Sequence, residues 1–164
     1  MALRSMDADN RGFTTRGGWW VLAQVPVMVG AFVAPLAWGA GSFDGANAIQ
    51  LAGAALTALG FLLAIAGLVA LGSALTPFPR PLANARLRQS GAYAWVRHPI
   101  YGAVVLASLG WSLSWLSLPG LLFSVVVVLF FDRKSAFEER LLRARFPEYA
   151  GYALRVRKLL PWIY

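Results

Sequence analysis

Three long stretches without a charged residue constrain this chain more than any other feature. They cover residues 19–40, 48–75 and 100–131 of the 164. A helix that crosses a bilayer needs about 20 mainly apolar residues, so each stretch can supply at least one spanning helix. Charged residues make up only 13% of the chain, against about 25% in an ordinary soluble domain. A soluble fold of this size could not cover so much apolar surface, and we therefore predict a membrane protein.

The third stretch is too long for one span and carries Pro119 and Gly120 in its middle. We interpret it as a tight hairpin at that pair, which joins spans over about residues 100–116 and 120–135. With the two earlier stretches, this predicts an all-α fold with about four transmembrane helices.

The chain turns amphipathic from Asp132 onward, and Pro147 interrupts the pattern. We expect the last span to continue into a polar helix, followed by a short helix over about 148–156 and an apolar end at the interface. The whole chain then forms one integral-membrane domain, with a lead-in over 1–18, two spans over 19–75 and a C-terminal core over 76–164.

Smaller residues and aromatic residues refine this prediction. Gly53, Gly60 and Gly67 are seven residues apart and share one helical face, which favours close packing of helices in lipid. Trp19 and Trp20 stand at the start of the first span, where interfacial aromatic anchors occur.

The distribution of charge predicts the orientation of the spans. With four spans, all fifteen Lys and Arg residues fall on one side of the membrane and only Asp44 on the other. The positive-inside rule puts that side, and both termini, in the cytoplasm. This topology accounts for most of the net charge of +8, so we expect no nucleic-acid partner. An attraction to anionic membrane lipids remains.

The absence of cysteine excludes disulfides, thiolate catalysis and Cys-ligated metals. A single histidine, His98, leaves a zinc site to be built mainly from carboxylates. We therefore expect no metal centre.

Two clusters could carry chemistry, over residues 91–101 and 133–142, and each lies where a charged segment meets a predicted span. Ionisable groups at membrane depth are costly and usually mark a function. His98 by itself would more often be a surface or capping residue. Here it lies beside Arg97 at the start of a span, with Pro99 suited to the first helical position and Tyr101 on the same helical face.

The second cluster contains two adjacent glutamates. Glu139 can pair with Arg143 one helical turn later, which is an ordinary structural role. Glu138 has Leu142 at the equivalent position, so it lacks this partner. It also points about 100° away around the helix, and it is freer to face a site.

Taken together, the clusters resemble the isoprenylcysteine carboxyl methyltransferase family, whose wider relatives are the phospholipid N-methyltransferases. The resemblance covers about residues 87–162, and the matching elements occur in order: Ser90-Gly91-Ala92-Tyr93, Arg97-His98-Pro99-Ile100-Tyr101, Glu138-Glu139, Phe146-Pro147-Glu148-Tyr149, Tyr152 and Pro161. The chain is shorter than the eukaryotic members, so it is similar to the compact prokaryotic ones, for which a bacterial inner membrane is expected.

The resemblance implies a methyltransferase that uses S-adenosylmethionine. The cofactor contacts it implies are Arg86, Leu87, Arg88, Tyr93, His98, Pro99, Ile100, Tyr101 and Glu138. As active-site roles, Arg97 or His98 could bind the cofactor carboxylate and Glu138 its ammonium group. Lys134, with Arg133 next to it, occupies the place of a basic family residue that faces the acceptor.

The resemblance also implies a lipophilic acceptor that arrives from the bilayer: a prenyl-cysteine carboxylate, a phospholipid amine or another small lipid. Methyl transfer from a sulfonium needs alignment in a dry site and no metal. Two other functions stay open, namely a non-catalytic membrane scaffold and an oxidoreductase similar to membrane sterol reductases. A transporter is disfavoured, because the predicted spans carry no buried charge and no matching pair of interrupted helices.

Overall fold

The computed structural model describes residues 13–14, 16–41, 46–80, 86–161 and 163–164. Within these ranges the protein is all-α and has no strand; one isolated bridge joins Val96 and Arg157. The α-helices are α2 (Gly18–Trp38), α3 (Ala48–Leu71), α4 (Pro99–Ser114), α5 (Leu118–Arg145) and α6 (Tyr149–Arg155). Two short 3₁₀ helices are η1 (Gly72–Ala74) and η2 (Gly91–Ala94). The prediction of an all-α fold is confirmed.

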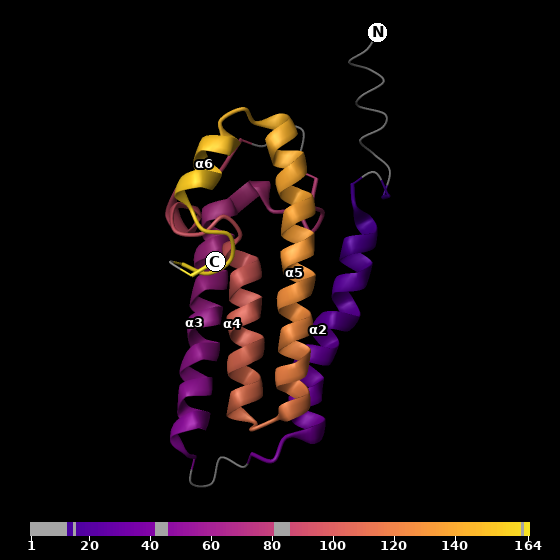
Figure 1. Cartoon of the computed structure of the whole chain (residues 1–164), viewed down its shortest axis with the longest axis vertical. Coiled ribbons are helices and arrows are strands. Elements are labelled where there is room, and N and C mark those ends of the chain that lie inside the picture. Colours follow the sequence, from indigo (N-terminus) through magenta and orange to yellow (C-terminus); the bar gives the residue numbers. More distant parts are fainter. Residues whose placement is uncertain (1–12, 15, 42–45, 81–85, 162) are drawn as a thin grey trace.

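The four long helices run side by side, and α6 lies at one end of them (Figure 1). Two segments, α2 and Ala48–Ala74, are long and apolar enough to cross a membrane. Only 22% and 11% of their most apolar windows are buried inside the protein, whereas the core helix of a soluble protein would be mostly buried. Lipid is therefore the natural solvent for their outer faces. The apolar α4 is shorter, with 16 residues, and the longer α5 carries charges from Asp132 onward.

The packing of α3 on α4 depends on small residues. Gly53, Gly60 and Gly67 are the buried glycines of α3, and they face α4. A Cβ atom added at Gly60 would lie 2.8 Å from the carbonyl oxygen of Ala103 and 2.8 Å from the amide nitrogen of Ala107. The predicted glycine face is confirmed, and it lets the two backbones approach closely.

The predicted hairpin between α4 and α5 exists, but its turn precedes Pro119 and Gly120. α4 ends at Ser114 and α5 begins at Leu118. Pro119 belongs to the first turn of α5, where the missing N–H of proline needs no partner. The hydroxyl of Ser117 caps this helix by accepting from the amide of Gly120 at 3.1 Å. Proline here starts a helix and does not form the turn.

The bundle is closed along α5, which runs without a break from its apolar half into its polar half, as predicted. Trp20 is buried against α5, with its ring centroid 5.5 Å from that of Phe130. It is therefore a packing residue and not an interfacial anchor. Trp19 is 52% exposed and remains available to the interface.

The segment after α6 folds back over the start of α4. The amides of Arg97 and His98 donate to the carbonyls of Arg157 (2.8 Å) and Lys158 (3.0 Å). Leu159 is buried, and its carbonyl oxygen approaches Gly102 so closely that a Cβ there would lie 2.0 Å from it. Leu159 therefore packs against the protein, which corrects the expectation that this whole segment lies at the interface.

Candidate active site

The two sequence clusters meet at the end of the bundle that carries α6, and Glu139 joins them. Arg97 Nε donates to Glu139 Oε1 at 2.9 Å, and His98 Nε2 lies 3.2 Å from the same oxygen. Arg143 Nη2 donates to Glu139 Oε2 at 3.0 Å, which confirms the predicted pair within α5. One buried carboxylate thus holds the start of α4 against the polar half of α5.

Arg97 extends this connection to α6. Its Nη1 donates to the carbonyl oxygens of Ala153 and Val156, both at 2.7 Å. These carbonyls lie at the C-terminal end of α6, where a helix leaves acceptors without intrahelical partners and where positive charge is favourable. Arg97 therefore ties three elements together with a side chain that is 13% exposed.

The charge of Glu139 is stabilised by these partners. Burial on its own would raise the pKa of this carboxyl group. The hydrogen bond and charge of His98, together with those of Arg97, outweigh burial and lower the pKa of Glu139 to about 2. Glu139 is therefore ionised under ordinary conditions, and its role is structural.

Glu138 has different surroundings. Its Oε2 accepts from the hydroxyl of Tyr101 at 2.8 Å and lies 4.0 Å from His98 Nδ1. The rings of His98 and Tyr101 are stacked, with centroids 5.4 Å apart and planes inclined by 4°, as expected for residues on one helical face. The hydroxyl of Tyr101 thus holds one oxygen of the Glu138 carboxylate in place. The same side chain lines open space.

That space consists of two adjoining cavities, which share Leu71, Thr76, Tyr93 and Glu138 in their walls. We call them the α6 cavity and the α2 cavity. The α6 cavity measures about 670 Å³ with its open mouth, and Tyr149 and Tyr152 of α6 line it. The α2 cavity measures about 810 Å³ with its mouth, and Gln24 of α2 lines it.

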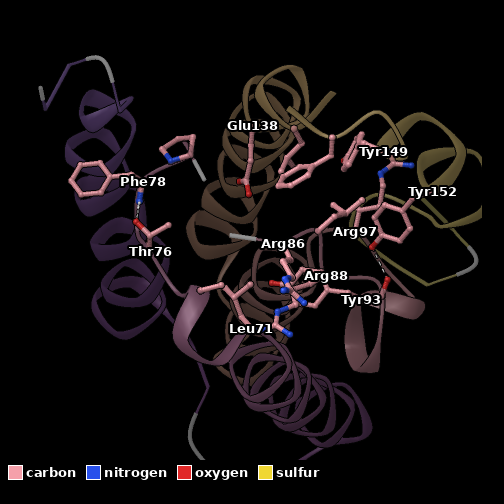
Figure 2. Close-up of a pocket in the computed structure, with 15 residues that line it drawn as sticks. Leu71, Thr76, Phe78, Arg86, Arg88, Tyr93, Arg97, Glu138, Tyr149 and Tyr152 are labelled. Atoms are coloured by element: carbon pink, nitrogen blue, oxygen red, sulfur yellow. Dashed lines mark hydrogen bonds between the residues drawn. The ribbon is translucent and has the colours of Figure 1, made fainter. Parts of the chain in front are cut away.

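The α6 cavity is walled by residues from several separate elements. Figure 2 shows Glu138 on α5, Tyr149 and Tyr152 on the α6 side, and Arg86 and Arg88 between them. The predicted site residues that line this cavity are Arg86, Leu87, Arg88, Tyr93, Arg97 and Glu138.

The α2 cavity lies between α2, α3, α4 and α5, toward the α6 end of the bundle. The predicted site residues that line it are Tyr93, His98, Ile100, Tyr101, Lys134 and Glu138. Two predicted residues line neither cavity. Pro99 is fully buried in the first turn of α4, and the Arg133 side chain is 76% exposed and lies 3.7 Å from Asp132.

Three tyrosines, Tyr93, Tyr149 and Tyr152, line the α6 cavity, and burial keeps their hydroxyl groups neutral. Burial, with a smaller contribution from the charge of Glu138, raises the pKa of Tyr93. Burial raises the pKa of Tyr152 to about 12, and its hydroxyl donates to the carbonyl of Tyr93 at 2.6 Å. Burial also raises the pKa of Tyr149, whose buried hydroxyl has no hydrogen-bond partner among the described residues.

Two features of the site are not predicted from the sequence. Lys134 is only 2% exposed, although it falls at the end of the predicted fourth span; the expectation that the spans hold no buried charge is wrong here. Gln24, which accepts a hydrogen bond from Lys134 Nζ, is not among the predicted site residues. One signal pointed to it, because Gln24 is the single polar side chain in residues 19–40.

A comparison of the sequence with known protein families indicates which kind of reaction this site supports. The family model described as phospholipid methyltransferase matches residues 49–149, which is more than half of the chain. The chain belongs to the phospholipid methyltransferase family. This confirms the resemblance drawn from the two clusters, because the family includes isoprenylcysteine-type members. No curated protein matches the chain.

Membership of the phospholipid methyltransferase family, with the two apolar helices, makes this a membrane protein with the features of a lipid methyltransferase. The family generally uses S-adenosylmethionine. The match includes both glutamates and the His98 block, but it begins after α2. The contribution of Gln24 to the α2 cavity therefore comes from outside the matched segment.

Proposed function

We propose that this protein transfers the methyl group of S-adenosylmethionine to a lipophilic acceptor at the cytoplasmic face of the membrane. The observation that carries the proposal is the pair of cavities with Tyr93 and Glu138 in their common wall. A transfer between two substrates needs both reacting atoms in one site, roughly 3 Å apart. One cavity adjoins the polar segments and α6, and the other lies among the long helices, as a water-soluble donor and a lipid acceptor would require.

The residues of the α6 cavity fit the cofactor. The Glu138 carboxylate can accept from an ammonium group, and Arg86 and Arg88 can pair with a carboxylate. The face of Tyr93 suits a cation. When bound, S-adenosylmethionine supplies an electrophilic methyl group on sulfur.

The other site residues act by positioning. Tyr101 holds the Glu138 carboxylate through its hydroxyl, and the His98 ring supports Tyr101 by stacking. Glu139 and Arg97 hold the start of α4 against α5 and α6, which keeps the walls of both cavities in place. Such preorganisation matters for an in-line displacement, because small misplacements are costly in rate.

We further propose one integral-membrane domain with four spans, in which α4 and the apolar half of α5 accompany the two long apolar helices. The excess of Lys and Arg at the α6 end favours a cytoplasmic location for this end and for both termini. The bacterial inner membrane suits a compact protein of this kind. Residues 76–164 contain most of the cofactor site.

Binding of S-adenosylmethionine by purified protein, measured by calorimetry in detergent and in nanodiscs, tests the function. We expect saturable binding, weakened roughly ten- to a hundredfold by Glu138→Gln, because a charge-assisted hydrogen bond is lost. Glu148→Gln is the matched control: it removes the same charge from an exposed residue that lines neither cavity, and binding should not change.

Two results would contradict the proposal. Absence of binding by folded protein in both environments would favour a scaffold or a reductase. Equal losses in the two glutamine variants would show that Glu138 has no specific role in holding the cofactor.

A further inference from the structure

A third hollow, separate from the two cavities of the candidate active site, is formed by the end of α6 and the segment that follows it. Arg97 lines it together with residues 153–158 and 163–164, and it measures about 760 Å³ with its open mouth. We call it the C-terminal hollow. It shares no lining residue with the α2 cavity and only Arg97 with the α6 cavity. A ligand in it would therefore be distinct from the donor and the acceptor of the proposed reaction.

Two of the basic side chains in the C-terminal hollow already have a carboxylate partner. Arg97 Nε lies 2.9 Å from Glu139 Oε1, and Lys158 Nζ donates to the carboxylate of Asp132. The hydroxyl of Tyr164 also donates to Asp132, at 2.8 Å. These contacts hold the folded-back segment against α4 and α5, and they compensate the charges of Arg97 and Lys158.

The other two basic side chains are uncompensated. Arg155 and Arg157 are exposed, and no carboxylate of the described residues lies within 4.0 Å of either. The backbone oxygen of Tyr164 accepts from amides of its own segment. Counting a terminal carboxylate at Tyr164 as well, the hollow keeps a net positive charge. Two guanidinium groups beside one opening suit a phosphate, because each can donate two parallel hydrogen bonds to it.

Apolar side chains stand exposed beside these charges. Leu154 is 89% exposed and Ile163 is 77% exposed, and both line the C-terminal hollow with the aromatic Tyr164. Basic residues next to exposed aliphatic and aromatic side chains are typical of protein surfaces at the lipid headgroups. A phospholipid offers both kinds of contact, with a phosphate for the arginines and acyl chains for the apolar residues. A free phosphate ion would leave the apolar side chains in water.

The position of the segment along the bundle agrees with this level of the membrane. Leu159 packs against Gly102, which lies in the first turn of α4, and Figure 1 shows the segment after α6 beside the start of this helix. With four spans, α4 starts at the cytoplasmic surface. The C-terminal hollow then lies beside the headgroups of the cytoplasmic leaflet, where anionic lipids bind basic pockets at the ends of spanning helices.

We propose that the C-terminal hollow binds the phosphate group of an anionic phospholipid of the cytoplasmic leaflet. Arg155 and Arg157 bind the phosphate, and Leu154 and Ile163 contact the adjoining part of the acyl chains. This lipid holds α6 and the following segment at the membrane and is not the methyl acceptor. The inference rests on the proposed four-span arrangement and does not depend on methyl transfer.

Lipids that share their chains and differ in headgroup test the site. Dihexanoyl phosphatidylglycerol, dihexanoyl phosphatidylcholine and dihexanoylglycerol are titrated against the protein in non-ionic detergent by calorimetry. We expect phosphatidylglycerol to bind roughly ten- to a hundredfold more tightly than dihexanoylglycerol, with phosphatidylcholine between them, because its trimethylammonium group is repelled by the arginines. The double variant Arg155→Gln/Arg157→Gln should lose this preference. Equal binding of the three lipids by the unchanged protein would overturn the inference.

The double variant Arg140→Gln/Arg145→Gln is the matched control. It removes the same number of positive charges from exposed positions of α5 that line neither the hollow nor the two cavities. It should keep the preference for phosphatidylglycerol. Equal losses in the two double variants would indicate a general effect of surface charge and would contradict the inference.

Inorganic phosphate distinguishes a lipid site from an ion site. At the concentrations that saturate phosphatidylglycerol binding, phosphate alone should neither bind nor displace the lipid. Binding of phosphate as tight as that of the lipid, lost in Arg155→Gln/Arg157→Gln, would reject the membrane as the source of the ligand.

A fluorescent label tests the location if the arginine variants fail to fold. The chain has no cysteine, so Leu154→Cys can carry a single bimane group, with Ala144→Cys in the last turn of α5 as the control. In nanodiscs, phosphatidylglycerol with brominated acyl chains should quench the label at position 154 much more than the label at position 144. It should also quench the label at 154 more than equally brominated phosphatidylcholine does. Equal quenching at the two positions would place the hollow away from the lipid and refute the site.

S-adenosylmethionine binding by the unchanged protein separates this inference from the proposed function. Preference for phosphatidylglycerol without cofactor binding would reject methyl transfer and leave the lipid site. Cofactor binding without that preference would reject only the lipid site.

Discussion

Two neighbouring residues of one type serve different purposes in this protein. Glu138 and Glu139 are adjacent on α5, and the helix turns their side chains about 100° apart. The Glu139 carboxylate lies within a cluster of basic side chains formed by Arg97, His98 and Arg143. Glu138 lines both cavities, accepts from the hydroxyl of Tyr101 and has His98 Nδ1 at 4.0 Å. The charge of Glu139 holds α4 and α5 together, whereas the charge of Glu138 stays available to a ligand.

Replacement of Glu139 tests this division. Glu139→Gln leaves Arg97 and His98 without their carboxylate, and we expect a loss of about 3 kcal/mol in the free energy of unfolding near neutral pH. The pKa of Glu139 in the folded protein, about 2, is below the ordinary value for a glutamate. Its contribution is therefore complete above the ordinary value and is lost as the pH falls toward about 2.

Unfolding followed by circular dichroism in detergent as a function of pH measures both effects. The unchanged protein should lose stability across this acidic range more steeply than Glu139→Gln does. Parallel pH profiles for the two proteins would show that Glu139 is not the responsible group.

At the level of helices, the sequence predicts features that depend on residues close together in the chain, namely helix ranges and contacts within one helix. The uncharged stretches predicted spans over 19–40 and 48–75, and the helices occupy Gly18–Trp38 and Ala48–Leu71. Spacing along one helix also predicted the pair of Glu139 with Arg143 and the glycine face of α3. The hairpin turn was displaced because proline is compatible with both a turn and a first helical turn.

Contacts between distant segments could not be predicted in this way. Lys134 and Gln24 are 110 residues apart, and Arg97 bonds to carbonyls 56 and 59 residues away. No periodicity within a helix encodes such pairs. The family resemblance pointed to Lys134, but the partner comes from α2, which the resemblance does not cover.

The α3–α4 contact yields a prediction at this scale. A Cβ at Gly60 would lie 2.8 Å from backbone atoms of α4, so Gly60→Ala should force the helices apart and lower stability by about 1–3 kcal/mol. Gly151→Ala is the control, since nothing lies within 4 Å of a Cβ there; alanine in α6 should add about 0.5–1 kcal/mol. Unfolding by sodium dodecyl sulfate can compare the two, and a stable Gly60→Ala protein would refute the tight contact.

In the whole molecule, the candidate active site lies at one end of the helix bundle. Both cavities, α6 and the folded-back segment lie where α3 ends and α4 begins (Figure 1). The four-span topology predicts all fifteen Lys and Arg residues of the sequence on this side of the membrane. The opposite end carries the α4–α5 turn, which has no basic residue.

This asymmetry predicts the membrane topology. The chain has no cysteine, so single cysteines introduced at exposed Gln89 and exposed Ala40 can be labelled without background. With four spans, a membrane-impermeant maleimide added to intact cells should label Ala40→Cys and spare Gln89→Cys until the membrane is opened. Labelling of both positions, or of Gln89→Cys alone, would contradict the proposed orientation.

The bonds of Arg97 to the far end of α6 also have a consequence for how the protein is made. The residues that brace the cavities, from Arg97 to Val156, enter the growing chain over a long interval, and the last of them are added after the helices of the bundle. A nascent chain halted after α5 lacks Tyr149 and Tyr152, two walls of the α6 cavity. Membrane insertion can therefore be well advanced on the ribosome while the site is still unfinished, and the site is complete only after α6 and the segment that follows it have been synthesised.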